Sequence, residues 1–120
     1  LLLLVTALGA AEALTLARRS GLDVGLVQQA MMGGMASSRV LDFFGSRMAA
    51  REFEAGIETR LYHKDLNTVM TLAHDLGVAL PAGAVTMQMI NGLIGRGHAR
   101  DDLSTLITAV EGLGLRPGQG

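Results

Sequence analysis

Hydrophobic residues recur at helical spacing along this chain, in segments that glycine and proline separate. Residues 1–20 are apolar on almost every side of a helix, so we expect a central, buried first helix. Gly21 suits the left-handed position that ends such a helix. Asp23 is placed to cap a short second helix, which would close at the glycines of 33–34.

Two further helices are predicted before the chain reaches its first proline. Ser37 or Ser38 can cap a third helix that carries apolar residues toward Met48. The fourth helix has the clearest pattern, and it should end at Gly77, ahead of Pro81. Its apolar stripe consists of Tyr62, Leu66, Val69, Met70, Ala73 and Leu76.

The last third of the chain predicts two more helices and a tail. The fifth helix covers about residues 81–94, and Gly95 and Gly97 should end it. Its inward positions are Val85, Met89, Ile90 and Leu93. Asp101 or Asp102 can cap the sixth, whose inward positions are Leu103, Leu106, Ile107 and Val110. Residues 115–120 read as a tail.

The pattern predicts an all-α fold, a compact bundle of five to six helices in a single domain over residues 1–120, because no segment alternates at the period of a strand. Residues 1–16 are too short for a membrane span and contain Glu12, and the arginines that follow lie on the wrong side for a signal peptide. We therefore expect a core helix and no membrane partner. If Glu12 is buried, its carboxylate should be paired, which is a structural role.

Composition narrows the possible functions. The formal net charge is −1, and the chain has no Trp, one Tyr and three Phe, so it lacks the basic and stacking surfaces of a nucleic-acid binder. It has no Cys, which excludes disulfides and thiolate zinc sites and fits a cytoplasmic location.

Motifs for metal and nucleotide binding are not evident. The three histidines, His63, His74 and His98, match no metal-ligand spacing, so we expect no metal site. The glycines at 95 and 97 begin a dinucleotide fingerprint, but Arg100 occupies the place of its last glycine and no strand precedes it.

One polar segment, Glu58 to Asp65, leads into the fourth helix. Lys64 should point almost directly away from the apolar stripe, and Asp65 should lie near the edge of the stripe. Lys64 is therefore either a solvated residue of the first turns or a donor to a bound ribose or carboxylate, and Asp65 is either a charge at the helix N-terminus or part of a pocket.

The order of these features resembles the C-terminal helical domain of the 3-hydroxyisobutyrate dehydrogenase family, which includes tartronate semialdehyde reductases and has a 6-phosphogluconate dehydrogenase-like C-terminal fold. The resemblance spans most of the chain. It is carried by Gly9-Ala10-Ala11-Glu12-Ala13-Leu14, Ala17, Gly21-Leu22-Asp23, Lys64-Asp65-Leu66, Leu76-Gly77-Val78, Pro81, Gly97 and Asp102-Leu103-Ser104.

The resemblance implies an oxidoreductase that exchanges hydride between NAD or NADP and a small β-hydroxy acid or its semialdehyde. In that family a Rossmann domain, joined N-terminally, holds most of the cofactor, and a catalytic lysine lies in G-x-x-x-K-x-x-x-N. By this resemblance the sequence begins where that motif would just have ended, so the lysine is expected upstream of Leu1, and we expect no catalytic residue and no activity in this chain alone.

The resemblance also assigns site residues. Lys64 would contact the cofactor near its nicotinamide end, and Asp65 would lie at the substrate pocket. Ile57 occupies the position where the family often has a Phe beside the reacting groups. Because of this departure, the resemblance does not define the lining of the pocket or the identity of the substrate. Asp102 and Ser104 are most simply helix-start groups.

Two other interpretations compete with this one. The chain could be a helical module whose role is to associate with itself, since apolar helix faces favour a homo-oligomer. It could also be a relative that kept the fold and lost the chemistry, because a fold does not fix a function.

Overall fold

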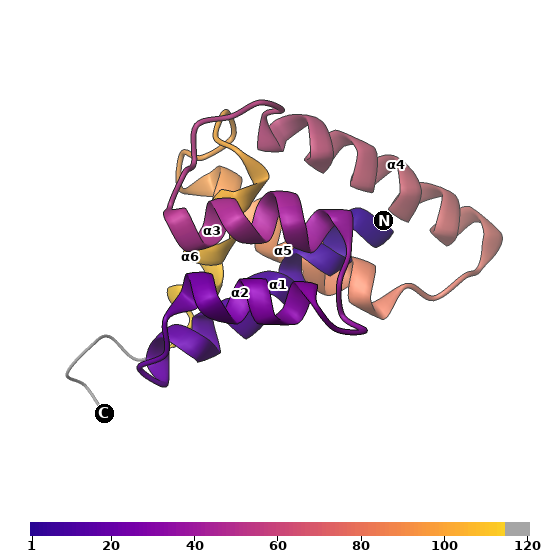
Figure 1. Ribbon diagram of the computed structural model, residues 1–120. Coiled ribbons are helices and arrows are strands. Elements are labelled where there is room, and N and C mark those ends of the chain that lie inside the picture. The colour runs from indigo at the N-terminus through magenta and orange to yellow at the C-terminus, as the bar shows by residue number, and fades with distance from the viewer. Residues whose placement is uncertain (115–120) are drawn as a thin grey trace.

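The structure, a computed structural model, describes residues 1–114, and the regular elements in that range are all helical, as predicted. The predicted tail, residues 115–120, lies outside the described residues. In chain order (Figure 1) the elements are α1 (Leu2–Arg19), α2 (Val24–Met32), the π-helical turn η1 (Leu41–Gly45), α3 (Ser46–Ala50), α4 (Thr59–Leu76), α5 (Pro81–Gly95), the 3₁₀ turn η2 (Leu103–Thr105) and α6 (Leu106–Glu111).

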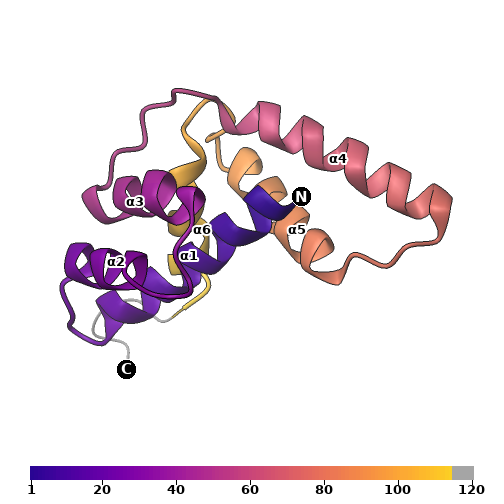
Figure 2. The same ribbon diagram turned by 45° about the vertical axis from the view of Figure 1, so that its right-hand side comes forward.

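Helix α1 is the central element of the fold. It packs most extensively on α6 and also contacts α2, η1 and α5 (Figure 2). Its buried side is rich in alanine, which lets neighbouring helices approach closely; the buried positions are Leu4, Ala7, Leu8, Ala10, Ala11, Leu14 and Ala17. The central position is as expected, but the helix is not buried all round, since Leu2 and Leu16 are exposed.

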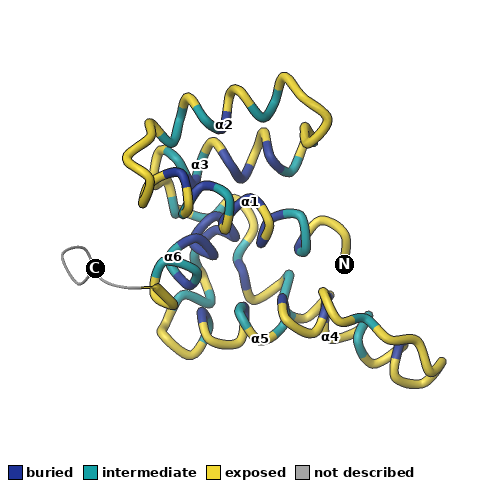
Figure 3. The backbone as a smooth tube through the Cα atoms, turned by 90° about the horizontal axis from the view of Figure 1, so that it is seen from below, coloured by how far each residue is buried: buried dark blue, intermediate teal, exposed yellow. Residues whose placement is uncertain are grey.

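The core lies where α1, α5, α6 and the η1–α3 segment meet. Figure 3 shows the buried backbone concentrated around α1 and α6, with the far end of the α4–α5 pair exposed. The largest fully buried apolar side chains of this core are Leu14, Met48, Leu66, Ile90, Leu93, Leu103, Leu106 and Ile107. Burial of each such aliphatic side chain contributes about 1.5–3 kcal/mol relative to exposure.

Helices α4 and α5 form an antiparallel pair, and α4 packs chiefly on α5. Leu66 and Ala73 of the predicted stripe are buried, whereas Leu76 is 68% exposed, so that part of the prediction was wrong. The reason is that the last turns of α4 extend beyond the rest of the fold. On α5, Ile90 and Leu93 face inward as predicted, but Val85 is 56% exposed.

Four helices end in the same hydrogen-bonded turn. At each end a residue with positive φ reverses the chain and its neighbours satisfy the last carbonyls of the helix. The residues with positive φ are Gly21, Arg51, Gly77 and Gly97. Three of these are the glycines that the sequence predicted, and Arg51 is the exception.

The predicted N-terminal caps are also confirmed. Asp23 accepts a hydrogen bond from the Leu26 amide at 3.0 Å, and the Ser38 hydroxyl accepts one from the Leu41 amide at 2.9 Å. Asp102 accepts from the Ser104 amide at 3.0 Å. No described helix is both long and apolar enough to cross a membrane.

Candidate functional site

The start of α4 is fixed by hydrogen bonds to the loop that follows α5. Thr59 is fully buried, and its amide and hydroxyl both donate to the Asp101 carbonyl, at 2.9 and 2.8 Å. The Arg60 amide donates to the Ala99 carbonyl at 2.8 Å, and Glu58 and Asp102 form an isolated antiparallel bridge. The segment that carries the candidate site residues is therefore anchored at its base.

The structure places Ile57, Lys64 and Asp65 on the surface. Lys64 points away from the buried Leu66, as predicted, and its ammonium forms no hydrogen bond or ion pair within residues 1–114. Ile57 is 52% exposed in the link before α4. None of these three side chains lines the groove formed by the first turns of α4 and the η1 turn.

A groove of about 340 Å³ opens between the N-terminal end of α1, the η1 turn and the first turns of α4. Its volume is near the lower end of the range for small-molecule sites. The lining residues are Leu3, Arg39, Val40, Asp42, Phe43, Phe44 and Tyr62. Asp65 lies one helical turn after Tyr62 and is close enough for its charge to act on the Tyr62 phenol.

Aromatic rings form one wall of this groove. Phe43 and Phe44 meet edge to face at 4.9 Å between ring centroids, and Phe44 meets Tyr62 in the same way at 6.2 Å. Burial raises the pKa of Tyr62 above its ordinary value of 10.0, and the charges of Asp102 and Asp65 raise it further. The phenol therefore stays protonated at neutral pH and can donate a hydrogen bond.

The π-helical turn η1 presents Asp42 and Phe43 to the groove. Such a turn inserts an extra residue into a helix and changes the direction of the side chains, and it is frequent at functional sites. Here it is supported by Gln28 of α2, a buried side chain whose Nε2 donates to the Leu41 carbonyl at 3.1 Å. The turn is thus held by a polar contact from α2.

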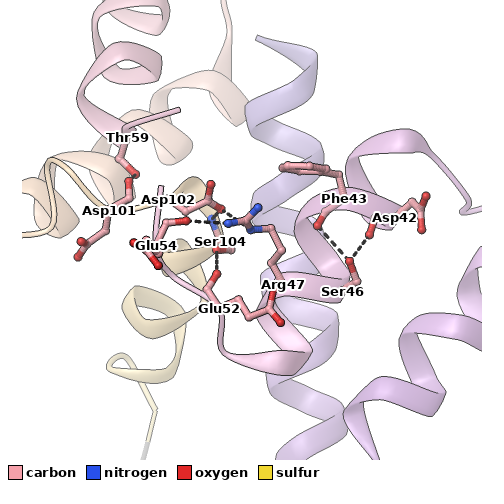
Figure 4. A network of polar contacts seen from close by, with 10 residues as sticks. All are labelled: Asp42, Phe43, Ser46, Arg47, Glu52, Glu54, Thr59, Asp101, Asp102 and Ser104. Atoms are coloured by element: carbon pink, nitrogen blue, oxygen red, sulfur yellow. Dashed lines mark hydrogen bonds and ion pairs between the residues drawn. The ribbon is translucent and has the colours of Figure 1, made fainter. Parts of the chain in front are cut away.

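Arg47 connects the groove to the anchored loop (Figure 4). Its Nε lies 3.5 Å from the Asp102 carboxylate, which is almost fully buried, and its Nη2 donates to the Glu54 carbonyl at 2.6 Å. The guanidinium also lies over the Phe43 ring, 5.2 Å from its centroid. Ser104 completes the network by donating to the Glu52 carbonyl at 2.9 Å.

Sequence reasoning missed this groove. Asp102 and Ser104 do begin a helix, as expected, but Asp102 also holds Arg47. Arg39 and Asp42 had no distinguishing pattern, because a charged residue beside a helix cap is common on any surface. Only the arrangement of α4 against η1 shows their position.

Among residues 1–114, no group of three potential metal-ligating side chains gathers in space. Glu12 is exposed, so it is not a buried charge that needs a partner.

These features define a class of protein: an all-α domain with an anchored polar helix start beside a small groove. Residues 1–110 match the family described as NAD-binding of NADP-dependent 3-hydroxyisobutyrate dehydrogenase. The chain belongs to this family, and the resemblance seen in the sequence is confirmed. NAD(P) is therefore the cofactor of the family in which the domain occurs.

Similar proteins of known sequence support the assignment to this family. The chain is 40% identical over 100 residues to a 2-hydroxy-3-oxopropionate reductase from Escherichia coli, covering 83% of this chain and 34% of that protein. It is 34% identical over 110 residues to a probable mitochondrial 3-hydroxyisobutyrate dehydrogenase-like protein from Arabidopsis thaliana, covering 90% of this chain and 32% of that protein. The chain thus spans about a third of the length of these relatives.

Solved structures share the fold. A 3-hydroxyisobutyrate dehydrogenase from Salmonella typhimurium superposes with a TM-score of 0.86 at 22% identity, over 89% of this chain and 38% of that chain. A 3-hydroxyisobutyrate dehydrogenase from Mycobacterium tuberculosis, solved with L-serine, gives a TM-score of 0.81 at 23% identity, over 91% of this chain and 40% of that chain.

Proposed function

We propose that this domain forms the helical wall of the active-site cleft in an NAD(P)-dependent dehydrogenase that interconverts a small β-hydroxy acid and its semialdehyde. The observation that carries the proposal is the family match over residues 1–110. The groove between η1 and α4, beside an anchored helix start, supports it. The complete enzyme would join this domain to an N-terminal Rossmann domain, so that the cleft lies between the two.

Lys64 fits a role in cofactor binding. It lies in the Lys64-Asp65-Leu66 motif, its ammonium has no partner within residues 1–114, and it can donate three hydrogen bonds. A ribose hydroxyl or the nicotinamide carboxamide would accept from it. Lys64 would thus close over the cofactor from the helical side, while most of the cofactor is held by the Rossmann domain.

Asp65 and Ile57 are proposed at the substrate side of the cleft. Asp65 follows Tyr62 by about one helical turn and its charge helps to raise the pKa of the Tyr62 phenol, which supports a position beside the groove. Ile57 would form an apolar wall in place of the larger Phe frequent in the family. A smaller wall leaves more room beside the reacting carbon, so this position would influence which acid is accepted.

The chemistry of the complete enzyme is a hydride exchange. When bound, NAD(P)H supplies the hydride that reduces the carbonyl carbon of a semialdehyde, and the oxidised form takes it back in the reverse direction. The carbonyl oxygen must gain a proton, and we expect the donor to be the lysine of the family's G-x-x-x-K-x-x-x-N motif. The residues of this chain orient the reactants and exclude water.

The proposed function is tested by assaying the complete protein with 3-hydroxyisobutyrate and with tartronate semialdehyde, each with NAD(H) and with NADP(H). Turnover with one pair is expected. Absence of turnover with all pairs, in protein that shows a cooperative thermal transition, would favour the alternative of a helical module without catalysis.

The role of Lys64 is tested in the same protein with Lys64→Ala and Lys64→Arg. We expect the KM for the cofactor to rise about tenfold in Lys64→Ala, the loss of a charged hydrogen bond, and to recover partly in Lys64→Arg. Arg100→Ala serves as the control because it removes an exposed cation outside the groove. If Lys64→Ala and the control have the same KM for the cofactor, Lys64 is a solvated surface residue and does not bind the cofactor.

We also propose that the protein is a cytoplasmic homo-oligomer. An apolar groove between α1 and α5 is bordered by Leu16, Val85 and Leu113, all more than half exposed, and such a surface favours a second copy of the chain. Sedimentation analysis should show a dimer or larger, and Leu16→Glu with Val85→Glu should shift it toward the monomer. A monomeric parent protein would exclude the proposed homo-oligomer.

The absence of cysteine from the 120-residue sequence supports the proposed cytoplasmic location.

A further inference from the structure

We propose that Arg39 and Asp42 form a recognition pair for the substrate in the groove between η1 and α4: Arg39 binds the carboxylate, and Asp42 binds a hydroxyl that is not oxidised. This inference rests on the proposed function, because it names the substrate class of the same cleft. It is carried by the position, charge and free hydrogen-bonding capacity of the groove residues.

Arg39 lines the groove and forms no hydrogen bond or ion pair within residues 1–114. In contrast, Arg18, Arg47, Arg51 and Arg60 each lie beside a carboxylate. A guanidinium has five donors and no acceptor, so its natural partner is a planar anion such as a carboxylate, which it can bind through two parallel hydrogen bonds.

Asp42 provides hydrogen-bond acceptors, whereas Arg39 provides donors. Its carboxylate also lines the groove, is exposed, and makes no side-chain hydrogen bond or ion pair within the described range. An ionised carboxylate is an acceptor only, so it binds a hydroxyl and repels a second carboxylate. The groove therefore carries one donor-only and one acceptor-only group, and this combination matches a hydroxy acid better than a dicarboxylate.

The remaining surface fits a short carbon chain. Phe43, Phe44 and Tyr62 provide a ring wall, and the Tyr62 phenol, which has no hydrogen-bond partner within residues 1–114, can donate to the ligand. The volume of about 340 Å³ suits a molecule of a few carbons.

This arrangement predicts the substrate class. Reduction of 2-hydroxy-3-oxopropionate at its aldehyde carbon adds a hydride to C3 and a proton to the C3 oxygen, and yields 2,3-dihydroxypropanoate. The hydroxyl at C2 is unchanged, so it is free to pair with Asp42. In 3-hydroxyisobutyrate a methyl group takes the place of this hydroxyl and would leave Asp42 without a partner. Substrates with a second hydroxyl should therefore be preferred.

The test uses steady-state kinetics of the complete protein with 2,3-dihydroxypropanoate and 3-hydroxyisobutyrate. In Arg39→Met we expect the KM of both acids to rise about ten- to a hundredfold, the effect of losing a charged hydrogen bond. The KM of the cofactor should stay within about twofold of the parent. Asp42→Ala should raise the KM of the dihydroxy acid only. The preference of the enzyme for the dihydroxy acid over 3-hydroxyisobutyrate should therefore become smaller.

Arg100→Met is the matched control, because it removes the same charge outside the groove. The inference is overturned if Arg39→Met and Arg100→Met behave alike. It is also overturned if Arg39→Met raises the KM of the cofactor instead, because Arg39 would then serve a dinucleotide phosphate.

A binding measurement separates this inference from the proposed function. In the 120-residue chain Tyr62 is the single tyrosine and there is no tryptophan, so tyrosine fluorescence reports on the groove. Added 2,3-dihydroxypropanoate should change the emission, sodium chloride at equal ionic strength should not, and Arg39→Met should abolish the response. A response without turnover in the complete protein would preserve the groove assignment and refute the dehydrogenase; neither response nor turnover would refute both.

Discussion

At the scale of single residues, Arg51 has a backbone conformation that is unfavourable for a residue with a side chain. Its φ of 57° lies in the left-handed region, which costs a residue with a Cβ about 1–2 kcal/mol. Its side chain offers compensation: two hydrogen bonds to Glu111, at 3.2 and 3.1 Å, and a stacking contact with the Phe53 ring. The arginine thus ties the end of α3 to α6.

Two substitutions separate these effects at Arg51. Arg51→Ala and Arg51→Gly both remove the side-chain contacts, but only glycine adopts positive φ without strain. We expect Arg51→Gly to be more stable than Arg51→Ala by about 1 kcal/mol in urea unfolding, as measured from the midpoints at equal slope. Equal stabilities would show that this backbone position is not strained.

Tyr62 provides a pH-dependent prediction. Burial first, and then the charges of Asp102 and Asp65, hold its pKa above 10.0 in the folded state. The folded state therefore binds this proton more tightly than the unfolded chain. The resulting stability is fully present below the unfolded pKa, near pH 10, and is lost as the pH rises through the folded pKa.

The near-ultraviolet absorbance of the phenolate measures this titration directly, because there is one tyrosine. The folded protein should titrate at higher pH than the protein in urea. Asp102→Asn, which keeps a capping side chain, should lower the folded midpoint because it removes one of the charges. A folded midpoint at or below that of the unfolded chain would contradict the assignment.

At the scale of elements, the π-helical turn η1 is the feature that sequence patterns did not predict. The third helix was expected to run uninterrupted from Ser37 or Ser38 toward Met48, and its cap at Ser38 is confirmed. Apolar spacing does not report an inserted residue within a helix. What accommodates η1 is a tertiary contact: Gln28 on α2 reaches the Leu41 carbonyl.

Gln28→Met tests that contact with little change in side-chain size. The Leu41 carbonyl would lose its donor in a buried position, so we expect a loss of about 1–3 kcal/mol in the free energy of unfolding. The exposed Gln29→Met is the control and should change stability by less than about 0.5 kcal/mol. If both variants unfold alike, the Gln28 hydrogen bond does not support η1.

At the scale of the whole molecule, the sequence predicted the elements well and their arrangement less well. The glycines at 21, 77 and 97 and the caps Asp23, Ser38 and Asp102 act locally, so their residue types are sufficient evidence. The predicted burial of Leu76 and Val85 was wrong, because the burial of these residues depends on how far each helix extends past its neighbours. For the same reason the groove was missed: its residues come from α1, η1 and α4, which are distant in sequence.

The contact between Arg47 and Asp102 is of this long-range kind, and it should be a main link between the two parts of the site. Asp102 is nearly fully buried, so loss of Arg47 would leave its charge without compensation in a region of low dielectric. Arg47 itself is partly exposed, so solvent screens part of the effect. We expect Arg47→Met to reduce the free energy of unfolding by about 2–3 kcal/mol.

A double-mutant cycle with Asp102→Asn isolates the pair. Because Asn keeps the cap on η2 but not the charge, the loss in Arg47→Met should be smaller in the Asp102→Asn background, with a coupling of about 1–2 kcal/mol in urea unfolding. Additive losses would instead assign the role of Arg47 to its hydrogen bond with the Glu54 carbonyl and its contact with the Phe43 ring. In that case the arginine would stabilise the groove wall without linking it to the loop that anchors α4.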